Sequence, residues 1–138
     1  MKSIFTLFAV ALVLNSYSVK ADDMDIVVQS LCDYAKTDNR SQLRKKIKQT
    51  RLQLNNVYGG IVCGSDGNFP GGSLLKMATF HGALDAVKYI ASQISSSAIT
   101  SPEADGVTIL DWSKALIAKD PSKAASVQPI IDYYEGKE

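Results

Sequence analysis

Hydrophobic residues recur at helical spacing along most of the chain, and the segments that carry this pattern fall into three consecutive pairs. Apolar side chains repeat within them at intervals of three and four residues, as expected for helices with one buried face. No segment alternates apolar and polar residues over a length that predicts a core strand. The pattern therefore predicts an all-α fold of three stacked helix-turn-helix pairs. The paired segments are 24–39 with 40–54, 73–82 with 83–93, and 108–118 with 122–135.

Residues that begin and end helices lie at the borders of these segments. Ser73 and Thr108 are expected N-caps, because their hydroxyls can accept a hydrogen bond from an amide of the first turn. Gly82 is expected to take the left-handed conformation that ends a helix. Pro129 lies inside the last segment and is expected to kink or split it. The polar stretch 95–106 is expected to be a loop.

The first 21 residues have the composition of a cleaved secretory signal peptide. Lys2 precedes an uninterrupted apolar run over residues 4–14, and Val19 and Ala21 occupy the small-residue positions before a cut. The run is shorter than the roughly 20 residues that a membrane-spanning helix needs. We therefore expect an exported chain, cut near Ala21–Asp22, in which residues 22–138 form a single domain.

Both cysteines, Cys32 and Cys63, lie in the part of the chain that is expected to be exported. An oxidising compartment favours disulfides, and two cysteines allow one pairing within the chain, so a Cys32–Cys63 disulfide is predicted. Two free thiols and a metal site are the alternatives. No metal is predicted, because two cysteines and a single histidine do not fill a zinc site.

The three pairs begin with related sequences, "SLCDYA" at residue 30, "SLLKMA" at 73 and "TILDWS" at 108. The last two starts are separated by close to the ankyrin period of about 33 residues. The segment "GGSLLKMATFHGALDAVKYI" resembles the ankyrin pattern of a capping residue, a leucine, an alanine, a His-Gly turn and a second helix. It departs from that pattern at Leu74 and Lys76, where ankyrin units have proline and histidine. The resemblance implies ankyrin-like stacking over about residues 71–135.

A second resemblance covers about residues 30–83. The stretch "LCDYAKTDNRSQLRKKIKQTRLQLNNVYGGIVC", followed by "GGSLLKMATFHGA", resembles a family of small exported proteobacterial proteins that is catalogued only as a domain of unknown function. The shared features are a Leu-Cys start, an Asp-Asn-Arg turn, a basic helix, a second cysteine and a Gly-x-Ser-Leu segment. The resemblance implies export and a disulfide, and it implies no activity.

Basic residues are concentrated between residues 36 and 51. At helical spacing Arg40, Arg44, Lys48 and Arg51 fall on one strip beside an apolar face. One interpretation is a solvated surface that keeps the end of a stacked array soluble. The other is a binding site for an acidic protein, anionic lipid headgroups or a surface polysaccharide.

The glycine-rich segment 55–72 is the other candidate binding element. It is expected to be a loop tethered by the disulfide, with Tyr58 and Phe69 as its recognition aromatics, because loops held on a rigid scaffold often carry binding sites. A long insertion made tolerable by the crosslink is the alternative interpretation.

His81 is the only histidine of the chain and is followed directly by Gly82. It is interpreted as part of the turn between two helices, with its ring bonded to the backbone of a neighbouring loop. The sequence contains no serine-hydrolase elbow, metalloprotease motif or phosphate-binding glycine loop. No catalytic residue and no cofactor is therefore predicted, and a small hydrolase that uses His81 is the enzymatic alternative.

Together these features predict a non-enzymatic, exported interaction module of the periplasm or cell surface. Its expected partner is a protein with an acidic surface. An inhibitor or immunity protein against an envelope enzyme and a peripheral binder of anionic membrane are the alternatives. Nucleic acid is disfavoured, because the exported compartment rarely offers it and no aromatic residue lies among the basic ones.

Overall fold

The structure is a computed structural model, which describes residues 21–138. The apolar run of the predicted signal peptide lies outside the described residues. Within residues 21–138 every regular element is helical, as the sequence pattern predicts. The α-helices are α1 (Ala21–Lys36), α2 (Arg40–Gln49), α3 (Leu54–Val57), α4 (Leu74–Phe80), α5 (Leu84–Ser92), α6 (Ser96–Thr100), α7 (Ile109–Lys119) and α8 (Ala124–Glu135), and the 3₁₀ turns are η1 (Tyr58–Gly60) and η2 (Pro121–Lys123).

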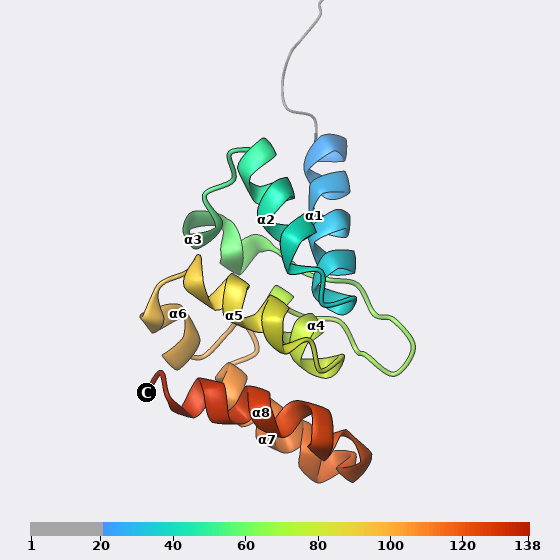
Figure 1. Cartoon of the computed structure of the whole chain (residues 1–138), viewed down its shortest axis with the longest axis vertical. Coiled ribbons are helices and arrows are strands. Elements are labelled where there is room, and N and C mark those ends of the chain that lie inside the picture. Colours follow the sequence, from blue (N-terminus) through green and yellow to red (C-terminus); the bar gives the residue numbers. More distant parts are fainter. Residues whose placement is uncertain (1–20) are drawn as a thin grey trace, which may run out of the picture.

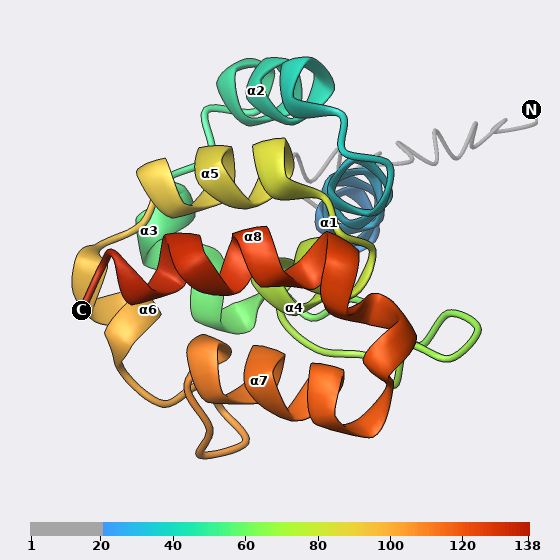
Figure 2. The same cartoon turned by 60° about the horizontal axis from the view of Figure 1, so that its bottom comes forward.

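The long helices stack as three pairs (Figure 1). Helix α1 packs against α2, α4 against α5, and α7 against α8. The first helices of the pairs also contact one another in the order α1, α4, α7, and the second helices do so in the order α2, α5, α8 (Figure 2). The predicted stack of helix pairs is confirmed, whereas its ankyrin-like character stays a prediction.

The turns within the first two helix pairs are closed by left-handed residues. After α4, Gly82 has φ 68°, and the amides of Gly82 and Ala83 bond the carbonyls of Thr79 and Ala78. This is the Schellman ending that a His-Gly pair predicts. Asp38, with φ 56°, ends α1 in the same way.

Asp38 also connects the first pair to the second. Its carboxylate accepts a hydrogen bond of 2.8 Å from the Ala86 amide in the first turn of α5. That turn has no capping side chain of its own, because Ala83 occupies its N-cap position. The turn of one pair therefore caps a helix of the next pair, which fixes how the two pairs are stacked.

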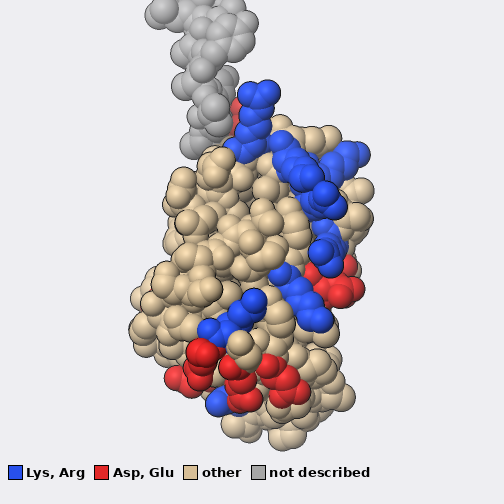
Figure 3. Space-filling model, turned by 60° about the vertical axis from the view of Figure 1, so that its left-hand side comes forward, with Lys and Arg blue, Asp and Glu red and all other residues tan. Residues whose placement is uncertain are grey.

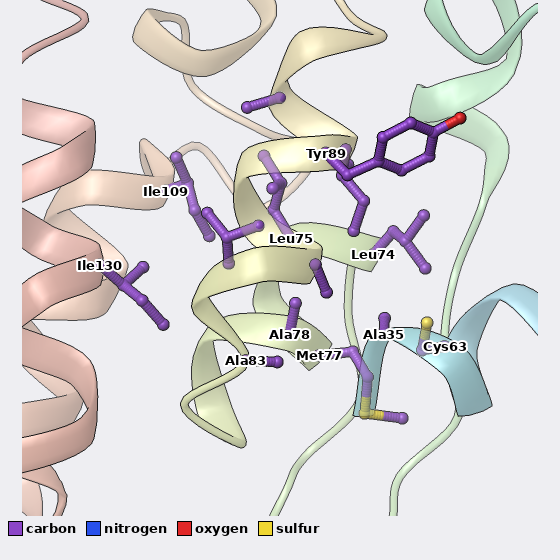
Figure 4. Close-up of a cluster of buried hydrophobic side chains, with 14 of the residues drawn as sticks. Ala35, Cys63, Leu74, Leu75, Met77, Ala78, Ala83, Tyr89, Ile109 and Ile130 are labelled. Atoms are coloured by element: carbon purple, nitrogen blue, oxygen red, sulfur yellow. The ribbon is translucent and has the colours of Figure 1, made fainter. Parts of the chain in front are cut away.

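The middle pair is buried on both sides. Every residue of α4 is buried, and its apolar side chains lie with those of α5 between Ala35 of the first pair and Ile109 and Ile130 of the third (Figure 4). Thr79 is buried in the same helix, where its hydroxyl forms a hydrogen bond of 2.8 Å with the Tyr134 hydroxyl of α8. Each fully buried Leu or Ile side chain contributes about 1.5–3 kcal/mol to folding, so the middle pair holds the stack together.

The Cys32–Cys63 disulfide is present, as predicted. It joins α1 to the segment after η1, the two Cα atoms are 5.7 Å apart, and both residues are buried. Among the described residues, no helix has the length and apolar character that crossing a membrane requires.

Two local predictions are wrong, and a third is wrong in part. The stretch 55–72 holds most of α3 and all of η1 before it becomes irregular, and the stretch 95–106 holds α6, whose first turn is capped by Ser95. The expected split of α8 at Pro129 is absent, because the helix continues through the proline, whereas the alternative of a kink stays a prediction. The carbonyl that this proline leaves without a helical partner belongs to Ala125, and both residues are exposed, so water can take the place of the missing hydrogen bond.

Candidate functional site

The predicted basic strip is an exposed surface at one end of the stack. We call Arg40, Arg44, Lys48 and Arg51 the basic face. The first three lie on α2, on a strip beside the side that buries Leu43 and Ile47, so the core fixes the direction of the basic side chains. Figure 3 shows lysine and arginine side chains in a band over the upper part of the molecule, where α1 and α2 lie, with acidic side chains gathered below.

No residue of the basic face has an acidic partner within the described part of the chain, where the ion pairs involve Lys36, Lys76 and Lys114 instead. Their positive charge reaches the neighbouring helix α5. Burial raises the pKa of the Tyr89 hydroxyl, and the charges of Arg44 and Arg40 oppose that rise. The basic face is therefore an uncompensated positive surface.

Arg51 differs from the other three residues in its backbone. It follows α2 with φ 52°, a left-handed conformation in which an L side chain is strained. Its amide bonds the Lys48 carbonyl and so closes the end of the helix. The prediction that all four residues share a helical strip is thus right for three of them, and Arg51 joins them through the turn.

Both predicted recognition aromatics are buried. Phe69 is fully buried, with its ring centroid 5.3 Å from that of Phe80, because the irregular hairpin 63–72 folds back onto the end of α4. Its prediction as an exposed binding residue is wrong. Tyr58 is also buried, in η1, and its hydroxyl donates a hydrogen bond of 2.7 Å to Glu103. Tyr58 is therefore packed into the body of the protein and does not lie on a free loop.

A buried polar network joins η1, α4 and the loop before α7. The Glu103 carboxylate accepts hydrogen bonds from Tyr58 and, at 2.9 Å, from the Ser73 hydroxyl, and it lies 3.7 Å from the Lys76 ammonium. Lys76 also donates a 2.6 Å hydrogen bond to Asp105. The side chains of Lys76 and Glu103 are each only 8 % exposed, so both charges are held almost out of water.

The electrostatics of this network follow from burial and charge. Burial, with the nearby Glu103 carboxylate, raises the pKa of the Tyr58 hydroxyl, and the tyrosine therefore stays a neutral donor. The hydrogen bond from Lys76 lowers the pKa of Asp105. Lys76 is thus held between two carboxylates, and its cation lies 5.6 Å from the centre of the Trp112 ring.

This network is not among the features that the sequence pattern predicts. The signal for it was Lys76, a charge within the apolar run Leu74 to Ala78. A lysine in a buried helix needs an acidic partner. Spacing alone does not identify that partner, because Glu103 and Asp105 lie in a loop that is separated from α4 by the helices α5 and α6.

Two cavities lie beside the network and adjoin at Pro70 and Trp112. The larger has a volume of about 990 Å³ and lies between the segment 58–65 and the loop 101–105, with Lys76 on its floor. The smaller, of about 430 Å³, continues between Asn68 and α7. We call the two together the groove.

His81 lies outside the groove, at the turn after α4. Its ring packs edge-on against Phe80 at 5.2 Å and near Phe69, and within residues 21–138 its buried Nε2 has no hydrogen-bond partner. The expected hydrogen bond to a neighbouring loop is therefore absent at this atom. Burial lowers the pKa of His81, and the charges of Lys36 and Lys123 act in the same direction.

The profile of one protein family matches residues 31–101, slightly more than half of the chain. It is described as "Protein of unknown function (DUF3718)". The chain belongs to this family. The resemblance stated from residues 30–83 is confirmed, and the match extends beyond it to include α5 and α6.

The DUF3718 match contains both disulfide cysteines and the whole basic face, and it ends just before Glu103. The third helix pair lies outside it. Searches of curated proteins and of solved structures found no match to the chain.

Proposed function

We propose that this protein is a non-enzymatic, exported binding module that engages a partner protein with an acidic surface through its basic face. The observation that carries the proposal is the exposed set of Arg40, Arg44, Lys48 and Arg51, for which residues 21–138 supply no ion pair. A charged surface of one sign steers an oppositely charged partner and raises its association rate by about 10- to 1,000-fold. An inhibitor or immunity protein that covers an acidic enzyme cleft is a narrower form of the same proposal.

Export is supported by two features of different kinds. The first is the composition of residues 1–21, with a positive start and an apolar run. The second is the buried Cys32–Cys63 disulfide, since such bonds persist in oxidising compartments. Periplasm and cell surface both meet this condition.

The test compares two variants with equal changes of charge. Arg40→Glu/Arg44→Glu reverses two charges of the basic face. The third-pair variant, Lys114→Glu/Lys137→Glu, reverses two exposed charges, one on α7 and one just after the end of α8. Arg51 is left unchanged, because a substitution at its left-handed backbone also alters stability. Each protein is immobilised in its oxidised form and exposed to envelope extract at low and at high salt, and the retained proteins are quantified by mass spectrometry.

We expect the wild type and the third-pair variant to retain the same acidic proteins at low salt. The basic-face variant is expected to lose them by about ten-fold or more, and high salt to reduce capture by the wild type. Equal capture by both variants would refute the proposal. Salt-sensitive sedimentation with phosphatidylglycerol vesicles, lost only in the basic-face variant, would assign the surface to a membrane instead.

A further inference from the structure

We infer that the groove binds an extended peptide segment of a partner protein, which adds as a β-strand to an open backbone edge at Val62 and Gly64. The inference rests on the proposed function, because it takes the partner to be a protein. The groove would be a second contact site, separate from the basic face, and it would accept an extended peptide.

The edge arises where the segment after η1 pairs with the residues just before α4. Cys63 and Gly72 exchange two backbone hydrogen bonds, of 2.7 and 3.0 Å. In an antiparallel pair the backbone groups of the two flanking residues point away from that partner. Those flanking residues are Val62 and Gly64, and within residues 21–138 their backbone groups form no hydrogen bond.

This open edge faces the groove. Val62, Gly64 and Ser65 all line the larger cavity, and Val62 exposes 66 % of its surface, which is unusual for an apolar side chain. An added strand bonds every second residue of such an edge, and its alternate side chains enter the pockets beside it. The cavity supplies the space and the edge supplies the donors and acceptors.

The edge is held rigidly, so little conformational entropy is lost when a peptide binds. The disulfide ties Cys63 to α1. The backbone of Gly71 lies so close that a Cβ there would be 3.2 Å from the Cys63 carbonyl oxygen. Further along the hairpin, Asp66 pairs with Lys36 of α1, and the Phe69 side chain is fully buried.

The size and charge of the groove also favour an extended chain. Small-molecule pockets have volumes of about 300–1,000 Å³, and the larger cavity alone reaches about 990 Å³ before the smaller one continues it past Trp112. The charge of Lys76 is already balanced by Glu103 and Asp105. The floor therefore attracts no free anion, and the unpaired backbone groups are the polar contacts that remain.

The test uses Gly64, where the chain offers a matched pair of variants. A Cβ at Gly64 meets nothing within 4 Å, and its φ lies outside the left-handed region, so Gly64→Ala retains both the fold and the amide donor. Gly64→Pro removes that donor. The probe is a synthetic dodecapeptide, obtained by selecting a random phage-displayed library against the oxidised wild-type protein.

We expect the selected peptide to bind Gly64→Ala within about two-fold of the wild type and Gly64→Pro about ten-fold more weakly, which corresponds to the loss of about one hydrogen bond. An added strand points every second amide toward the edge. N-methylation of that set of peptide amides is expected to abolish binding, whereas N-methylation of the other set is expected to leave it intact. This second measurement is independent of how well Gly64→Pro folds. Hydrogen exchange at the Val62 and Gly64 amides is expected to slow when the peptide binds.

Two results would overturn the inference. In the first, the library yields no binder. In the second, the binder is affected equally by methylation of either set of alternate amides and is affected by neither Gly64 variant. A peptide that is lost only in Arg40→Glu/Arg44→Glu binds the basic face, so the proposed function then survives while this inference fails. A peptide that depends on Gly64, with no capture dependent on the basic face, gives the reverse outcome.

Discussion

Breaking the Cys32–Cys63 bond should cost a large part of the stability of this fold. The bond closes a chain separation of 31 residues between α1 and the wall of the groove. The perturbation is chemical reduction of the wild-type protein, which removes the crosslink and retains both side chains. A Cys32→Ala/Cys63→Ala variant is the partner experiment, because it also removes the buried sulfur atoms.

The magnitude follows from the length of the closed loop. In the chain-entropy description, a crosslink lowers the entropy of the unfolded chain by an amount that grows with the logarithm of loop length. For a separation of 31 residues this corresponds to about 3.7 kcal/mol at 25 °C. Unfolding entropies per residue are similar among proteins, and for a domain of this size the loss lowers the melting temperature by about 15 °C.

The assay is urea unfolding followed by circular dichroism, with oxidised and reduced protein in parallel and thiols quantified at each point. We expect the midpoint to fall and the denaturant slope to rise on reduction, because the reduced unfolded chain exposes more surface. The alanine variant should lie at or below the reduced protein, since it adds small cavities. A difference below about 1 kcal/mol between the two redox forms, or an unchanged slope, would refute the reasoning from loop length.

Three further predictions concern single positions. Glu103→Gln should destabilise the fold by about 2 kcal/mol in urea unfolding, because the buried carboxylate accepts hydrogen bonds from two hydroxyls and faces the Lys76 ammonium. An unchanged unfolding midpoint would contradict a stabilising role of this network. Gly82→Ala should lower the free energy of unfolding by about 2 kcal/mol or more, because the left-handed φ is combined with a new Cβ only 2.6 Å from Ser126. Gly106→Ala is the control, since Gly106 is also left-handed but a Cβ there meets open space, and it should cost about 1 kcal/mol. Equal losses in the two variants would exclude a role for Ser126. Because the pKa of His81 is lowered in the fold, the imidazole of the unfolded chain binds a proton more readily than that of the folded chain. The contribution of neutral His81 to stability should therefore be complete above its usual pKa of 6.5 and be lost as the pH falls from there through the lowered pKa of the folded state. His81→Gln should flatten the decline in melting temperature between about pH 7 and 5, and a curve identical to that of the wild type would count against this assignment.

Local rules account for most of the fold. The caps at Ser73 and Thr108 and the left-handed Gly82 lie where the sequence predicts them, because capping depends on residues within one turn of the chain. The disulfide was predictable for a different reason, since two cysteines leave only one pairing. Helix α6 was missed because its serine-rich sequence has almost no apolar face, and only Ile99 is buried within it.

The candidate site was less predictable, because its parts meet only in three dimensions. The exposure of Arg40 and Arg44 could be predicted from the apolar positions Leu43 and Ile47, because all four residues share one helix. The burial of Phe69 could not, since it depends on a hairpin that folds back onto α4. A glycine-rich neighbourhood indicates a loop and carries no information on which side of that loop packs.

Both walls of the groove depend on the first turn of α4. One wall reaches it through Gly72, where a Cβ would lie 2.7 Å from the Lys76 side chain, so only glycine leaves room for the lysine stem. The other wall reaches it through Glu103, which accepts from Ser73 and faces Lys76. Because α4 is buried on every side, neither wall can shift without disturbing the central helix pair. The groove is therefore built into the core of the stack, and the disulfide secures its outer edge from the side of α1.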